Sequence, residues 1–287
     1  MYHAGSVDTI HRFAHGLYLR GNYTFSKTID DATNELNSST INPRRPLDAR
    51  NISADRGRSA LDFTHKVAVS WVYDLPNVRV GNRFVGGFIH GWEVSGSYLF
   101  ESGQPVTLLN GSDANANGSA TADRPVFNPA GTLNVPSGIN FVCVDGAGNT
   151  SVQGSATGCG GATNVAGYVA ANPASRYVKA GLGTDNNIIG RDTINTPGLN
   201  LWNIALLKST KFGERLNVQF RAETYNTFNH RNFSIGLPSN NGALDSTTNP
   251  NPFAGGLVLI TAPSSFLNFH QFTGGNRTMQ LGLKLIF

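Results

Sequence analysis

Seven segments of the chain alternate apolar and polar residues with a period of two, and this pattern constrains the fold more than any other feature. The segments are residues 2–11, 16–26, 62–73, 91–102, 201–209, 215–226 and 279–287. Alternation of this kind indicates β-strands whose two faces meet different surroundings. Most segments are about 9–12 residues long, which is longer than a usual globular strand and matches a tilted strand that crosses a bilayer.

The composition fits the same class of structure. Charged residues make up only 14% of the 287 residues, against roughly 25% in an ordinary soluble domain. Glycine is abundant, with 33 residues, and the mean hydropathy is −0.20. No run of 18 apolar residues is present, which excludes a helical membrane span. We therefore predict an all-β fold: an antiparallel transmembrane β-barrel segment of about seven long strands that occupies residues 1–287.

The two faces of the predicted strands differ in a way that suits a barrel wall. In the segment 215–226 the polar face carries amide and opposed charged side chains, and we expect these to face the barrel lumen: Asn217, Gln219, Arg221 and Glu223. Aromatic residues on the apolar faces, such as Trp71, Trp92 and Trp202, are expected near strand ends, where a membrane barrel carries its aromatic girdles.

Connection lengths alternate between short and long along the chain. Short links of residues 12–16, 74–87 and 209–214 alternate with long ones of residues 28–61, 103–200 and 230–276. Outer-membrane barrels combine short periplasmic turns with long extracellular loops, whereas a compact soluble domain rarely holds three long structureless loops. The C-terminus is then expected on the periplasmic side.

Two motifs lie in the longest loop. Cys143 and Cys159 suggest one disulfide in an oxidising compartment, with two free thiols as the alternative. Asp113, Asn115 and Asn117 have the offsets of a calcium-binding loop, but Arg124 stands where the final Glu is needed. A solvated turn rich in Asn and Asp is the stronger interpretation, so we predict no metal site and no cofactor.

Other classes of function find little support. The net charge is +4, yet Lys and Arg are scattered, which argues against a nucleic-acid partner. No catalytic motif is found, so we do not expect an enzyme. The alternative from another class is a secreted β-rich binding module, such as a lectin-like sandwich, whose core could also hold the aromatic residues.

Several stretches resemble a known family. These are "YTFSKTIDDATNE", "ADRGRSALDFTHKVAVSWVYDLP", "GWEVSGSYLFESGQPVTL", "DRPVFNP", "GLNLWNIALLKSTKFGERLNVQFRAETYNTFNHRNF" and "MQLGLKLIF". In this order they are similar to the C-terminal barrel of Oar-like TonB-dependent receptors. The resemblance implies a plugged 22-stranded type of barrel in the bacterial outer membrane. It also implies import of a large, scarce extracellular solute with energy delivered by TonB.

The resemblance assigns roles to both ends of the chain. The alternating terminal strand, with Leu281, Leu283, Leu285 and Phe287 on one face, looks like the signal read by the barrel-assembly machinery. No secretory signal, plug or TonB box is visible near Tyr2. The expectation is therefore a C-terminal fragment of a receptor, which faces membrane lipid, contacts TonB only through missing N-terminal parts and is not transport-competent alone.

Overall fold

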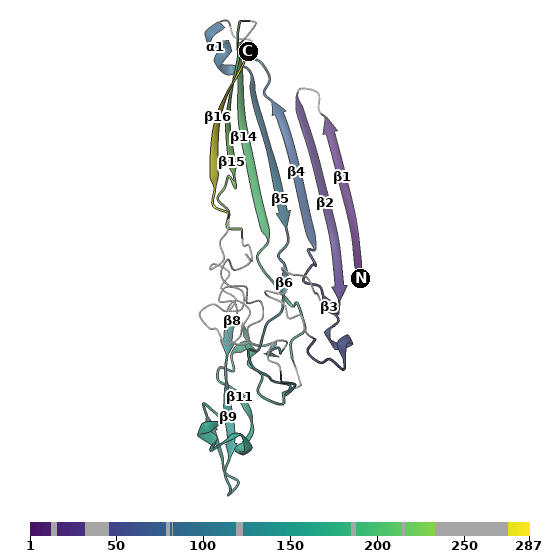
Figure 1. Cartoon of the computed structure of the whole chain (residues 1–287), viewed down its shortest axis with the longest axis vertical. Helices are drawn as coiled ribbons and strands as arrows, with labels where there is room; N and C mark the ends of the chain where they lie inside the picture. Colours follow the sequence, from purple (N-terminus) through teal and green to yellow (C-terminus); the bar gives the residue numbers. More distant parts are fainter. Residues whose placement is uncertain are drawn as a thin grey trace.

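The computed structural model contains one large antiparallel sheet with an elaborate set of loops at one end (Figure 1). It describes residues 1–12, 16–31, 46–78, 81, 83–118, 123–184, 188–213, 216–232 and 275–287. The long strands are β1 (Tyr2–Arg12), β2 (Leu17–Asp30), β4 (His65–Asp74), β5 (Trp92–Glu101), β14 (Leu199–Phe212), β15 (Leu216–Tyr225) and β16 (Thr278–Ile286). They pair in the order β1-β2-β4-β5-β14-β15-β16, so each long strand neighbours the next one along the chain. The predicted all-β fold is confirmed.

The strand register keeps like faces together across the whole sheet. Leu206 of β14 lies opposite Val94 of β5 on one side and Ala222 of β15 on the other. Opposed residues of an antiparallel pair point to the same side of the sheet. One side is therefore predominantly apolar and is called the apolar face here. The other side is called the polar face, and on it Ser97 lies opposite Ser70 and Asn203.

The two ends of the sheet also differ, as the link lengths predict. The strand ends that are joined by residues 13–16, 75–91 and 213–215 lie at the same end of the sheet as the C-terminus (Figure 1). The links formed by residues 31–64, 102–198 and 226–277 all start from the opposite end. These are called the turn end and the loop end. For the barrel predicted from the sequence, the turn end is expected on the periplasmic side and the loop end outside the cell.

Two of the long links contain regular structure of their own, which the sequence pattern did not reveal. Residues 102–198 fold into small sheets of their own, and residues 31–64 contribute a 3-10 turn and a short strand. These elements are η2 (Ile52–Asp55), β3 (Gly57–Arg58), β6 (Pro105–Val106), β7 (Val126–Phe127), β8 (Thr132–Ser137), β9 (Ile139–Val144), β10 (Thr150–Gln153), η3 (Thr157–Cys159), η4 (Ala162–Asn164), β11 (Val165–Ala170), β12 (Ser175–Val178) and β13 (Ile194–Asn195). Long backbone segments pair internally because buried peptide groups need hydrogen-bond partners.

These loop elements also hold the best-buried side chains that the structure describes. Val106, Leu108 and Ala180 are fully buried, whereas the strands of the sheet are mostly half-exposed. The described parts of residues 46–64 and 102–198 are called the loop cap here. The packed core of the described chain thus lies in the cap and not between layers of the sheet.

Trp71 corrects the expected position of the aromatic residues. It lies well inside β4, and its ring centroid is 6.1 Å from that of Trp202, which in turn is 4.2 Å from Tyr98. Tyr73 and Trp92 do lie near the turn end, as a girdle requires. Trp71 therefore belongs to an aromatic cluster within the apolar face.

The Trp71 ring lies across Gly96 of β5, which predicts a large effect of a small substitution. A Cβ atom at Gly96 would lie 2.3 Å from Cζ2 of Trp71 and 2.6 Å from the carbonyl oxygen of Asn203. We expect Gly96→Ala to destabilise the refolded full-length protein by about 1–3 kcal/mol, as overpacking does. Urea unfolding in detergent micelles, followed by the gel-mobility shift of the folded barrel, measures this.

Gly21→Ala is the matched control, because no atom lies within 4 Å of a Cβ at Gly21 in β2. Its midpoint should stay close to that of the unsubstituted protein. Equal midpoints for the two variants would contradict the packing of Trp71 over Gly96.

Candidate functional site: the polar face and the loop cap

The polar face is a continuous surface of hydrogen-bonded side chains. Ion pairs join Arg20 to Asp8 at 3.1 Å and Lys66 to Glu101 at 3.2 Å, each across neighbouring strands. Amide and hydroxyl groups connect further strands, as in the 3.2 Å bond from Asn203 Nδ2 to Ser97 Oγ. The face therefore satisfies much of its own polarity while it remains open to water.

A hollow on this face spans five strands. Its lining includes Tyr18, Ser70, Ser97, Asn203 and Glu223, which come from β2, β4, β5, β14 and β15 in turn. A depression that reaches side chains of five adjacent strands is what a sheet that curves toward its polar face produces. This is the curvature of a barrel wall with a polar interior.

The four side chains predicted to face the lumen share this face. Asn217, Gln219, Arg221 and Glu223 lie opposite polar-face positions of β14 and of β16. Arg221 pairs with Glu223 at 2.8 Å, and Ser209 donates a 2.9 Å hydrogen bond to Asn217.

The terminal strand presents its four signal residues on the other face. Leu281, Leu283 and Leu285 lie opposite Ala222, Phe220 and Val218 of β15, and all three leucines are exposed. Phe287 follows β16 and is also exposed. A role of this strand in barrel assembly stays a prediction.

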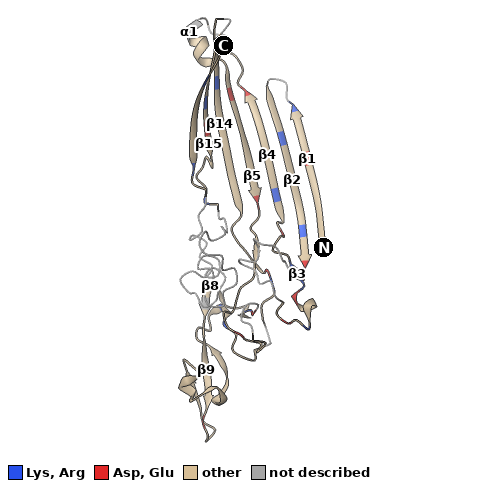
Figure 2. Ribbon diagram, viewed as in Figure 1, with Lys and Arg blue, Asp and Glu red and all other residues tan. Residues whose placement is uncertain are grey.

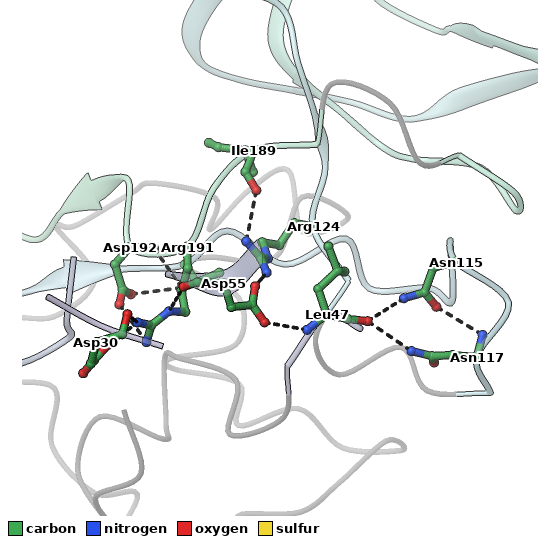
Figure 3. Close-up of polar contacts among 10 residues, drawn as sticks. Asp30, Leu47, Asp55, Asn115, Asn117, Arg124, Ile189, Arg191 and Asp192 are labelled. Atoms are coloured by element: carbon green, nitrogen blue, oxygen red, sulfur yellow. Dashed lines mark hydrogen bonds and ion pairs between the residues drawn. The ribbon is translucent and has the colours of Figure 1, made fainter. Parts of the chain in front are cut away.

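The loop cap is fastened to the sheet by a buried network of ion pairs (Figure 3). Arg124 forms an ion pair with Asp55 and donates a 3.4 Å hydrogen bond to the carbonyl oxygen of Ile189. Arg191 forms an ion pair with Asp30 at the end of β2 and also donates, at 3.2 Å, to the carbonyl oxygen of Asp55. The network joins three parts of the chain that lie far apart in sequence. Sequence reasoning missed it, because nothing local marks residues paired over such separations.

A second carboxylate, Asp62, holds the beginning of β4 to β2. It accepts hydrogen bonds from the Thr28 amide at 2.6 Å, Arg58 Nε at 2.9 Å and Lys27 Nζ at 3.1 Å. Burial alone would raise the pKa of this carboxyl group, but the three donors outweigh burial and lower its pKa. Asp62 therefore stays ionised and keeps its position at neutral pH.

Asp192 occupies a less favourable environment. Its Oδ1 accepts a 2.9 Å hydrogen bond from Thr107, and Arg191 is 3.5 Å from its Oδ2. Burial nevertheless raises the pKa of Asp192 to about 6, against the lowering effects of Arg191 and Thr107. Burial likewise lowers the pKa of the Arg124 guanidinium to about 10. The buried charged groups of the network therefore pair with one another. The network stabilises the cap, and ligand contacts are left to exposed residues.

The candidate calcium loop forms a turn that clamps two parts of the cap. Asp113 accepts hydrogen bonds from the amides of Asn117 at 3.2 Å and Gly118 at 2.8 Å. The side-chain amides of Asn115 and Asn117 both donate to the carbonyl oxygen of Leu47, at 2.8 and 3.4 Å (Figure 3). Among the described residues, no three His, Cys, Asp or Glu side chains are grouped so that they could hold a metal ion. The contacts are those of a turn rich in Asn and Asp.

Cys143 and Cys159 are joined by a disulfide, with their Cα atoms 5.2 Å apart. The bond ties β9 to η3 in a three-stranded arm formed by β10, β9 and β11, which projects farthest from the sheet (Figure 1). Closing a loop of this size stabilises the arm by about 3 kcal/mol in the entropic model.

The geometry agrees with the comparison to known families. A family model described as an outer membrane beta barrel domain matches residues 1–280. The chain belongs to this family. No characterised protein and no solved structure matches the chain.

Membership of the outer membrane β-barrel family places the protein in the bacterial outer membrane. The fold also argues against the lectin-like alternative. A sandwich consists of two packed sheets, whereas the seven long strands form one sheet. In the described part of the chain, no helix is long and apolar enough to span a bilayer. Figure 2 shows that the strands carry few charged residues, which suits a barrel wall.

The raised pKa of Asp192 predicts that the cap opens more readily as pH rises. In the closed cap its pKa is about 6, above the usual value of 3.8, so the closed cap binds the proton more tightly. The stability of the closed cap therefore falls as pH increases between about 4 and 6. The loss is about 3 kcal/mol for a pKa difference of about two units. The Asp192 amide donates to Thr107 at 3.1 Å, and hydrogen exchange at this amide reports opening.

After correction for intrinsic exchange, opening should be up to about 100-fold more frequent at pH 7 than at pH 4. Asp192→Asn should remove this difference. Asp145→Asn, in the exposed Asp145 turn of the arm, should leave it unchanged. The same pH dependence in Asp192→Asn as in the unsubstituted protein would refute the assignment.

Proposed function

We propose that the protein contributes to a TonB-dependent receptor that binds a large, scarce solute outside the cell and imports it. The observation that carries the proposal is a folded loop cap joined directly to a polar wall of strands. The ion pair of Arg191 with Asp30 anchors the cap to the loop end of β2, and the ion pair of Arg124 with Asp55 joins the two parts of the cap. A binding surface built on such loops holds its shape, and this reduces the entropy lost on ligand binding.

The polar face supports the same function. A lumen lined by amides, hydroxyl groups and paired charges suits the passage of a hydrated solute around a plug. Arg221 and Glu223 exemplify this lining, since each charge has a partner of opposite sign. The resemblance to Oar-like receptors adds the energy source, which is TonB.

In the proposed receptor the wall contains strands beyond these seven. β1 and β16 form the two edges of the sheet among the described residues, and both run from the loop end to the turn end (Figure 1). Direct pairing of these two edges would be parallel, whereas bacterial barrels pair their strands antiparallel. An odd number of further strands between β16 and β1 restores antiparallel pairing and leaves no edge exposed to lipid.

The proposal is tested by uptake in cells that produce the full-length protein. A panel of iron chelates, oligosaccharides, peptides and metal complexes is offered with and without an uncoupler of the proton-motive force. We expect one class of solute to require the protein for uptake and its uptake to collapse with the uncoupler. The purified protein should also show no steady conductance in planar bilayers, because a plug fills the barrel.

Two variants localise the function to the cap. Deleting residues 139–170 removes the disulfide-linked arm and should impair uptake without loss of the barrel from the membrane. Val152→Ser, an exposed change within the arm, is the mild control. Uptake that persists with the uncoupler, or a large steady conductance, would instead identify a passive channel.

A further inference from the structure

One link at the turn end is much longer than a barrel turn needs. Residues 75–91 join β4 to β5 and contain the only α-helix in the described part of the chain, α1 (Arg83–Ile89). The other two links at this end are residues 13–16 and 213–215. Neighbouring antiparallel strands can be joined by two to five residues, so connection alone does not account for α1.

Contacts with the sheet place α1 on the side of the apolar face. Lys208 of β14 lies opposite Trp92 and Phe220, so its side chain projects from the apolar face. Its Nζ donates hydrogen bonds to the carbonyl oxygens of Gly87, at 2.9 Å, and of His90. The Trp92 indole donates a 2.9 Å hydrogen bond to the carbonyl oxygen of Phe88. Two side chains of one face therefore hold the C-terminal end of α1.

These contacts also provide polar partners for the charge of Lys208, which projects from the apolar face. A lysine on a lipid-facing surface is costly, and long side chains near the interface avoid the cost by extending toward polar groups. Lys208 does this by reaching the last carbonyl groups of α1, where a cation is favoured by the helix dipole.

Several apolar side chains of residues 75–91 are exposed. Phe88 is 75% exposed, Val78 is 59% exposed, and Val85 and Ile89 are each 42% exposed. Helix α1 itself lies at the turn end of the sheet, near the C-terminus (Figure 1). In sequence, residues 75–91 contain Arg79 and Arg83 and no acidic residue, so the link is positively charged.

We propose that α1 is an interfacial membrane anchor, whose Phe88, Val85 and Ile89 enter the inner leaflet of the outer membrane. A short helix with an apolar surface and basic flanks binds at the boundary between headgroups and acyl chains, and anionic headgroups attract its cations. Lipid is the occupant that fits, because α1 lies on the same side as the surface that already faces lipid. A plug or other lumen component lies on the polar face, behind the sheet.

A spin label at position 88 tests the anchor in the full-length protein, reconstituted in vesicles of phosphatidylethanolamine and phosphatidylglycerol. Phe88→Cys provides the attachment site, since the disulfide protects Cys143 and Cys159. Glu93→Cys is the matched control, because Glu93 is the second residue of β5 at the same end but projects from the polar face. The label at 88 should collide several-fold more with oxygen, relative to a water-soluble nickel complex, than the label at 93.

Either of two other outcomes overturns the anchor. Equal ratios at both positions mean that α1 is in water. Protection from both reagents at position 88 means that a protein surface covers it. If the variant at 88 does not refold, Val85→Cys gives the same comparison from the neighbouring exposed position.

A second variant tests whether Lys208 holds α1 in place, independently of whether Phe88 enters the membrane. Lys208→Met removes the donor to Gly87 and His90 but keeps an apolar side chain on the sheet. The spectrum of the label at 88 should then show faster motion. Lys211→Met, at a polar-face position of the same strand, should leave the spectrum unchanged, and equal spectra for both variants would contradict the role given to Lys208.

Discussion

The antiparallel hydrogen-bond ladder of the seven long strands is the constraint on which the rest of the structure depends. Its register places Phe220 between Lys208 and Leu283, and Arg221 between Leu207 and Gly282, so that each strand adds to the same two faces. In lipid the ladder also satisfies the backbone, because no water is present to do so. A shift of one residue in any pair would exchange the two faces of that strand.

The ladder also determines where the other elements lie. Because successive strands reverse direction and the links alternate in length, the long links all leave from one end. There the described parts of residues 46–64 and 102–198 pack against each other. Asp30, at the end of β2, receives Arg191 from the longest link, and Asp55 receives Arg124. At the other end, Lys208 and Trp92 hold α1 on the apolar side. One sheet thus positions a structured cap at its loop end and a short helix at its turn end.

The sequence was sufficient to predict the strands and their faces, since alternation over ten residues is a local signal that tertiary packing rarely overrides. Seven predicted segments correspond to β1, β2, β4, β5, β14, β15 and β16. The small sheets of the cap were missed because strands such as β6 and β13 have two residues and no period. Helix α1 was missed because Gly86 and Gly87 lower helix propensity, and its position rests on distant Lys208. Trp71 was misplaced because only the register reveals that Gly96 gives its ring room.

The central claim is that one face of the sheet meets lipid and the other meets an aqueous lumen. Single cysteines along β15, from Asn217 to Thr224, test it in the reconstituted full-length protein, with reactivity toward a membrane-impermeant thiol reagent as the measurement. The account predicts a period of two: high reactivity at 217, 219, 221 and 223, and low reactivity at 218, 220, 222 and 224. Uniform reactivity along the strand, or alternation of the opposite phase, would contradict it.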